Sequence, residues 1–155
     1  MAIRDYVSVA NEYIEEVLSG KRPACQFVKM ACERQKRDLA DGVLGYCFDK
    51  RYAARVCLFI ENLRHVKGAL ANHLIHLEPW QVFILTTVFG WVDADGKRRY
   101  RHVYIEVPRG NGKSALSSGV ALYALSADGE PGAECFTFAT KQDQAKIVFD
   151  VAKKM

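Results

Sequence analysis

The stretch HVYIEVPRGNGKSALSS, residues 102–118, decides how the rest of the chain is interpreted. Residues 102–107 carry apolar side chains at alternate positions, which is the pattern of a buried strand. Pro108 then ends strand pairing because it has no backbone N–H to donate. The Ala-, Leu- and Ser-rich residues from Lys113 onward can form a helix. This stretch therefore predicts a strand, a glycine-containing loop and a helix, in that order.

Strand, glycine loop and helix together are the context of a phosphate-binding loop. Glycines permit positive φ and let backbone N–H groups come close to phosphate oxygens, and the following helix N-terminus adds partial positive charge. Lys113 can reach β- and γ-phosphate oxygens, and the Ser114 hydroxyl can be a ligand of Mg²⁺. The candidate nucleotide-binding residues of this loop are Pro108, Arg109, Gly110, Asn111, Gly112, Lys113, Ser114 and Ala115.

The loop does not match the full consensus G-x-x-x-x-G-K-[ST], because Val107 stands where the first glycine would be. A glycine-rich turn with a solvated lysine is therefore the alternative interpretation of the same residues.

Trp80 and Gln81 form a second candidate group, upstream of the loop. Pro79 suits the first turn of a helix that Gly90 ends. A glutamine amide can donate to and accept from an adenine edge, and a tryptophan ring can stack on the base. The pair equally suits the start of an amphipathic helix with a core tryptophan, so both interpretations stay open.

Composition narrows the class of protein. A chain of 155 residues, 50% hydrophobic and 26% charged, can form a globular domain with its own core. The N-terminus has no signal-peptide pattern, and no apolar run is long enough for a membrane span. Five cysteines without a C-x-x-C pair predict reduced, mostly buried thiols of an intracellular protein, and we expect no zinc site. The net charge of +4 permits contact with nucleic acid without arguing for it.

The N-terminal third predicts three helices. Apolar residues at helical spacing from Ile3 to Leu18 predict the first, which Ser19-Gly20 ends. The second runs from Pro23 to about Leu39. Asp49 is predicted to cap the third. The side chains predicted to face inward on the second helix are Phe27, Val28 and Ala31.

The rest of the chain predicts an α/β core. Asp95-Gly96 indicates a turn, and a helix is expected from Lys113 to about Ser126. A second strand over 133–139 precedes a last helix that Thr140 can cap. A shift in composition near residues 69–76 marks the expected join between helical region and core. The order β–loop–α–β–α opens a P-loop α/β fold.

Several stretches resemble the large terminase subunit of tailed phages, the motor that packages viral DNA. They are PWQVFI with FGW, RRYRHVYIEVPRGNGKS, LYALSADGEPGAE and ATKQDQAKIVF, in the family's order and near its spacing. The resemblance covers most of the chain. The family's loop commonly lacks the first glycine and carries a basic residue inside, as Arg109 does here.

The resemblance implies an α/β fold with a P-loop NTPase-type core of the additional-strand, catalytic-glutamate class. This truncated core would span residues 76–155 and follow a helical N-terminal region, residues 1–75. The implied activity is ATP hydrolysis with Mg²⁺. Gln81 would read adenine, Lys113 and Ser114 would hold phosphate and Mg²⁺, and Arg109 would stabilise charge near the γ-phosphate, although Arg109 can also be a plain surface arginine.

The resemblance also implies partners: double-stranded viral DNA, the portal protein, the small terminase subunit and further copies in a homo-oligomeric ring, in the host cytoplasm and without a membrane. After Ser114 no apolar run is followed by Asp-Glu, the pair that would complete hydrolysis. We therefore expect an N-terminal part of a terminase, inactive alone, whose remaining motifs and endonuclease lie outside this sequence.

In this fold class the strands expected at 103–107 and 133–139 are not neighbours, so we expect unpaired strand edges and marginal stability or aggregation. Two other functions stay open. One is a helicase-like or other P-loop ATPase with an upstream adenine-reading glutamine. The other is a non-catalytic module that binds a partner.

Overall fold

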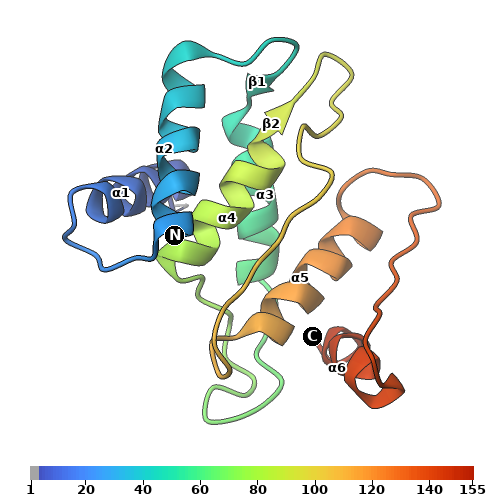
Figure 1. The fold of residues 1–155 in the computed structure, drawn as a ribbon. Helices are drawn as coiled ribbons and strands as arrows, with labels where there is room; N and C mark the ends of the chain where they lie inside the picture. Colours follow the sequence, from blue (N-terminus) through green and yellow to red (C-terminus); the bar gives the residue numbers. More distant parts are fainter. Residues whose placement is uncertain (1–3) are drawn as a thin grey trace. The chain divides into compact units, whose positions relative to one another are not determined.

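Six helices and two short strands form in residues 4–155, the part of the chain that the computed structural model describes (Figure 1). In chain order the elements are α1 (Tyr6–Leu18), α2 (Gln26–Asp41), β1 (Cys47–Phe48), α3 (Lys50–Glu61), α4 (Pro79–Gly90), β2 (Trp91–Val92), α5 (Lys113–Ser126) and α6 (Gln142–Ala152).

The chain packs as two compact units that alternate along the sequence. Unit 1 combines the residues up to Cys57 with Glu78–Val103, and unit 2 combines Leu58–Leu77 with Tyr104–Met155. Helix α3 contributes its first turns to unit 1 and its last turn to unit 2. The boundary predicted between residues 75 and 76 rests on a shift in composition, not on packing, and it stays a prediction.

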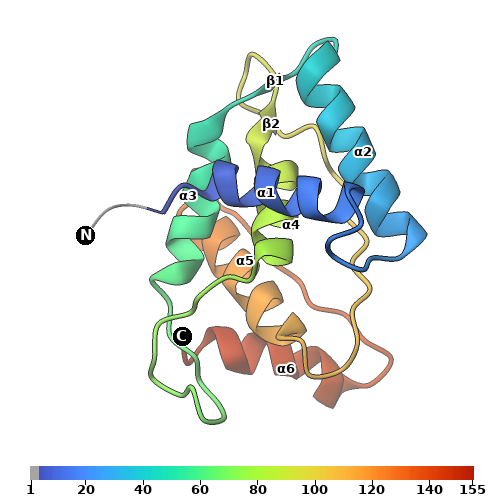
Figure 2. The same ribbon diagram turned by 90° about the vertical axis from the view of Figure 1, so that its left-hand side faces the viewer.

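Helix α4 is the core of unit 1. Its side chains are apolar on nearly every side, and eight of its residues are buried. Helix α1 packs across it (Figures 1 and 2). The rings of Tyr13 and Phe83 lie 5.4 Å apart. The apolar stripe predicted for α1 is confirmed, and Ser19-Gly20 ends the helix with Gly20 at a φ of 79°. Ile3, at the start of the predicted stripe, lies outside the described residues.

Helix α2 turns a polar face toward the core of unit 1. The prediction that Phe27 faces inward is wrong, because its side chain is 79% exposed; Val28 and Ala31 are half-buried. Cys32, Gln35 and Asp38 are buried instead. Trp91 Nε1 donates to Gln35 Oε1 at 2.9 Å, and Arg99 Nη1 donates to Asp38 Oδ2 at 2.7 Å. These partners are distant in sequence, so local periodicity could not indicate which face is buried.

Strands β1 and β2 pair antiparallel, with Phe48 opposite Trp91, and bring α3 close to α4. At the end of α4, the Gly90 carbonyl accepts a hydrogen bond from the Asp49 N–H at 2.8 Å. A Cβ atom at Gly90 would lie 2.5 Å from Phe48 Cε2 and 3.0 Å from Ala53 Cβ. Gly90 therefore permits this close approach.

Two further predictions, the helix cap at Asp49 and the turn at Asp95-Gly96, are confirmed. Asp49 precedes α3 and accepts the Arg51 N–H at 2.7 Å, and the hydrogen bond from the Arg51 side chain holds the pKa of Asp49 below its usual value. Gly96, at a φ of 78°, closes the predicted turn by donating to the Asp93 carbonyl at 3.0 Å.

Unit 2 is built on the packing of α5 against α6 and the end of α3. The Tyr123 ring meets Phe59 edge-on at 5.5 Å, and a Cβ atom at Gly119 would lie 3.1 Å from Ile60 Cγ1. The buried Ser118 hydroxyl lies 2.8 Å from the Val148 carbonyl oxygen and ties α5 to α6. The predicted α5 is confirmed at both ends.

The cap predicted for the last helix is wrong. Lys141, not Thr140, occupies the N-cap position of α6, and its side chain makes no capping bond. The Thr140 hydroxyl instead lies 3.4 Å from Gln144 Oε1. Because the helix begins at Gln142, Thr140 stands one residue too early to cap it.

Neither predicted strand of the α/β core forms in the described residues. Segments 102–107 and 133–139 lack strand structure, and the only strands within residues 4–155 are β1 and β2 of unit 1. Among residues 4–155 the N–H and C=O groups of both segments make no backbone hydrogen bond. A strand exists only when another strand pairs with it. Both segments have the alternating apolar side chains of a strand, but within the described residues no other strand pairs with them.

The cysteine thiols were predicted to be mostly buried, and this prediction is wrong. All five cysteines are free, as predicted, but only Cys32 and Cys57 are buried, while Cys25, Cys47 and Cys135 are exposed. Within the described chain no group of His, Cys, Asp and Glu side chains is suited to a metal ion. The described helices are also too short or too polar to cross a membrane.

The first prediction tests the contact at Gly90. Gly90→Ala should destabilise unit 1 by about 1–3 kcal/mol, because the new methyl group overlaps the Phe48 ring. Both tryptophans of the chain lie in unit 1, so urea unfolding followed by tryptophan fluorescence reports on it. Phe48→Leu in the same chain should restore part of the loss. An unchanged midpoint for Gly90→Ala would contradict the packing described.

A second prediction concerns the thiols. Burial raises the pKa of Cys32 to about 11, so that its reactive thiolate is scarce near neutral pH. Iodoacetamide should modify Cys25, Cys47 and Cys135 in the native chain and reach Cys32 and Cys57 only after denaturant is added. Intact mass measures the number of adducts. Rapid modification of Cys32 in the native chain would show that its surroundings open readily.

Candidate functional site

The loop between Pro108 and Lys113 has the backbone that its glycines predict. Gly110 has a φ of 92°, and Gly112 has a φ of 70° and stands at the N-cap of α5. Both values lie in the region that favours glycine. Asn111 Nδ2 donates to the Pro108 carbonyl at 3.2 Å and braces the turn from inside. The chain thus reverses within a few residues and enters a helix of 14 residues.

The Lys113 side chain folds back across this loop. Its Nζ donates to the Val107 carbonyl oxygen at 2.7 Å. Val107 occupies the position of the first consensus glycine, so the lysine contacts the residue at which the sequence departs from the motif. Because a main-chain carbonyl makes this contact, a valine provides it as well as a glycine. Sequence reasoning missed this role of Val107, although its position at the start of the motif was a signal.

The loop offers several unused donors. Among the described residues, the N–H groups of residues 111–115 have no hydrogen-bond acceptor. They stand at the N-terminus of α5, where the helix carries partial positive charge. Lys113 and Arg109 add two exposed cationic side chains. This set of donors suits a polyphosphate.

The remaining loop residues are accessible. Ser114 and Ala115 are half-buried in the first turn of α5, and Pro108 is exposed. The Ser114 hydroxyl makes no hydrogen bond with the described residues, while its carbonyl lies 2.7 Å from the Ser118 hydroxyl. A hard cation such as Mg²⁺ prefers oxygen ligands, so the free hydroxyl beside the unpaired N–H groups fits a phosphate-bound Mg²⁺.

Trp80 and Gln81 lie in the first turn of α4. Gln81 Oε1 accepts the Glu78 N–H at 2.9 Å, and Gln81 is 9% exposed, whereas Trp80 is half-buried. Gln81 therefore stabilises the start of the helix. The start at Pro79 is as predicted, but α4 is apolar on nearly every side, not amphipathic, and Trp80 is not a core residue. Trp80 and Gln81 belong to unit 1, whereas the loop belongs to unit 2. Each group is therefore described within its own unit.

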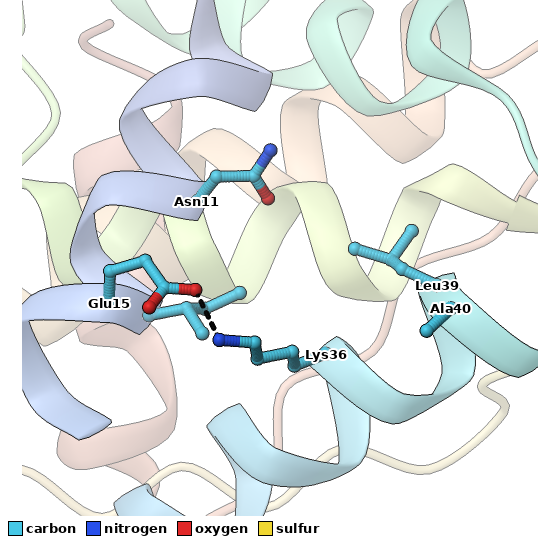
Figure 3. Close-up of a pocket in the computed structure, with 6 residues that line it drawn as sticks. Asn11, Glu15, Lys36, Leu39 and Ala40 are labelled. Atoms are coloured by element: carbon cyan, nitrogen blue, oxygen red, sulfur yellow. Dashed lines mark hydrogen bonds and ion pairs between the residues drawn. The ribbon is translucent and has the colours of Figure 1, made fainter. Parts of the chain in front are cut away.

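A hollow with the volume of a ligand site lies between α1 and α2 in unit 1 (Figure 3). It measures about 380 Å³, and Lys36 Nζ contacts Glu15 Oε1 at 2.6 Å within it. The two charges neutralise each other, and no candidate residue lines the hollow. It is not a candidate site.

Comparison with known proteins gave one match. The sequence profile of the family described as terminase large subunit, ATPase domain, matches residues 79–155. The matched region begins at the first residue of α4 and contains the loop, α5 and α6. No curated protein and no solved structure matched the chain.

Proposed function

Residues 79–155 belong to the terminase large-subunit ATPase family, and from this premise we propose that the loop between Pro108 and Ala115 binds ATP. The family identifies the region as a packaging-motor ATPase module. The observation that carries the proposal is the group of unpaired N–H donors around Gly112 with the Lys113 ammonium folded beside them.

Each loop residue has a proposed part in binding. The N–H groups of residues 111–115 donate to phosphate oxygens of the substrate. The Lys113 ammonium exchanges the Val107 carbonyl for β- and γ-phosphate oxygens, which are stronger acceptors because they are charged. The Ser114 hydroxyl holds Mg²⁺, which when bound neutralises part of the phosphate charge.

Arg109 is proposed to act on the transition state. Its guanidinium is exposed, and no ion pair within the described chain holds it. It can therefore reach the equatorial oxygens of a phosphoryl group, where charge is spread during transfer. Trp80 and Gln81 are proposed to bind the adenine. The Gln81 amide keeps two N–H donors and a second lone pair after it caps α4.

The proposed packaging function involves DNA and protein partners as well as the nucleotide. We propose that hydrolysis is coupled to translocation of double-stranded viral DNA into a procapsid by a homo-oligomeric ring that contacts the portal protein and the small terminase subunit. The family assignment supports this context. The residues that polarise water, and a nuclease, are proposed to come from outside this sequence.

A third prediction tests nucleotide binding. Lys113→Ala should weaken binding of a non-hydrolysable ATP analogue with Mg²⁺ at least tenfold, because the phosphate loses a charged donor. Isothermal titration calorimetry measures the affinity. Lys146→Ala removes an equally exposed lysine from α6 and should leave it unchanged. If the Lys113 variant binds as tightly as the parent, the loop is a structural turn and the chain is better described as a non-catalytic module.

A fourth prediction concerns Arg109. In a hydrolysis-competent protein that contains this chain, Arg109→Ala should lower kcat by about a hundredfold or more while KM changes little, since the contact forms mainly in the transition state. Steady-state ATPase kinetics separate the two parameters. Comparable losses in nucleotide affinity and turnover would assign Arg109 to ground-state phosphate binding.

A further inference from the structure

The Ser118 hydroxyl lies between the two last helices of unit 2. Ser118 is completely buried on α5, and its Oγ lies 2.7 Å from the Ser114 carbonyl oxygen and 2.8 Å from the Val148 carbonyl oxygen of α6. A serine hydroxyl carries one hydrogen, so it donates to only one of these two acceptors at a time. Because the two distances are nearly equal, a small change at either acceptor decides which of them receives the hydrogen bond.

One of the two acceptors belongs to the proposed nucleotide site. The Ser114 carbonyl shares a peptide group with the Ala115 N–H, which is one of the unpaired donors of the loop among the described residues. When a peptide N–H donates to an anion, the peptide group is polarised and its carbonyl becomes a stronger acceptor, by about 10–30% for each hydrogen bond in a chain. A phosphate oxygen at the Ala115 N–H therefore draws the Ser118 hydroxyl toward Ser114 and away from Val148.

Helix α6 is attached weakly enough for this one hydrogen bond to matter. Of its residues, all of which the structure describes, only Val151 is buried. The Thr137 hydroxyl donates to the Ala145 carbonyl at 2.9 Å and holds the first turn of the helix, whereas the Ser118 contact lies one turn further on, at Val148. Elements with few buried apolar contacts are the ones that open locally. Loss of the Ser118 contact should therefore loosen the later turns of α6.

We propose that Ser118 is a positioning residue that couples occupancy of the nucleotide loop to the attachment of α6; the inference rests on the nucleotide binding proposed above. In the empty loop the hydroxyl is available to Val148 and holds α6. In the occupied loop it donates to the Ser114 carbonyl, steadies the helical turn that carries the proposed Mg²⁺ ligand, and releases α6. Such coupling is reciprocal, so a firmly attached α6 lowers the affinity of the loop for phosphate.

Hydrogen–deuterium exchange of the full chain tests this coupling, with a non-hydrolysable ATP analogue and Mg²⁺ as the ligand and calorimetry to measure its binding. In the parent chain the ligand should make the amides of residues 148–152 exchange about threefold faster. Ser118→Ala should speed their exchange already without ligand, abolish the further increase, and weaken ligand binding about threefold. Ser118→Cys keeps a weaker donor and should give an intermediate response, with far-UV circular dichroism confirming retained helices in both variants.

Ser126→Ala is the matched control. Ser126 lies on the same helix, and its hydroxyl donates to the Leu122 carbonyl at 2.6 Å, four residues back, with no second acceptor among the described residues. This variant should match the parent in exchange and affinity. A parent chain that binds the analogue without faster exchange in α6, or a Ser118→Ala variant that keeps the parent's response, would overturn the coupling while nucleotide binding stands. If the parent does not bind the analogue at all, the proposed function falls and this inference falls with it.

Discussion

Helix α4 has no polar face, and the need to cover it on all sides organises unit 1. Val82 and Leu85 are almost completely buried, and α1 lies across the helix from one side. Phe48 and Ala53 close on its last residue, where only a glycine fits. Because α4 is also the first element of the matched family region, the N-terminal helices are part of the same folded unit as the beginning of the ATPase region. They are not an appendage joined to it by a linker.

This arrangement explains why packing and family resemblance divide the chain differently. A resemblance follows contiguous motifs, and the change in composition near residues 69–76 is real. Packing follows apolar surface instead, and α1, which precedes α4 in sequence, covers part of the apolar surface of α4. Two further contacts join residues that follow α4 to helix α2: the Arg99–Asp38 ion pair and the Trp91–Gln35 hydrogen bond.

The sequence predicted what depends on local signals. Pro79 and Gly90 mark α4, Asp49 caps α3, and Gly112 begins α5, because each acts through backbone atoms a few residues away. It failed at Phe27, since the inward face of α2 is polar and is satisfied by Trp91 and Arg99 from distant positions. It missed β1 and β2, which are two residues each and carry no periodic pattern. Segments 102–107 and 133–139 have the composition of strands, but strand formation is a property of a pair.

The sequence predicted the glycine turn and the helix start of the loop before α5, but it did not predict the contact between Lys113 and the Val107 carbonyl. Two glycines at positive φ set its turn whether or not the preceding segment is paired in a sheet. Lys113, held by the Val107 carbonyl, keeps its ammonium close to the unpaired N–H groups. Both partners are solvent-accessible, so releasing the ammonium costs little more than one exchangeable hydrogen bond. A polyphosphate offers charged oxygens in return. In the function proposed above, the lysine would exchange this carbonyl for an anion, and because the contact is made by the main chain, it does not need the first consensus glycine.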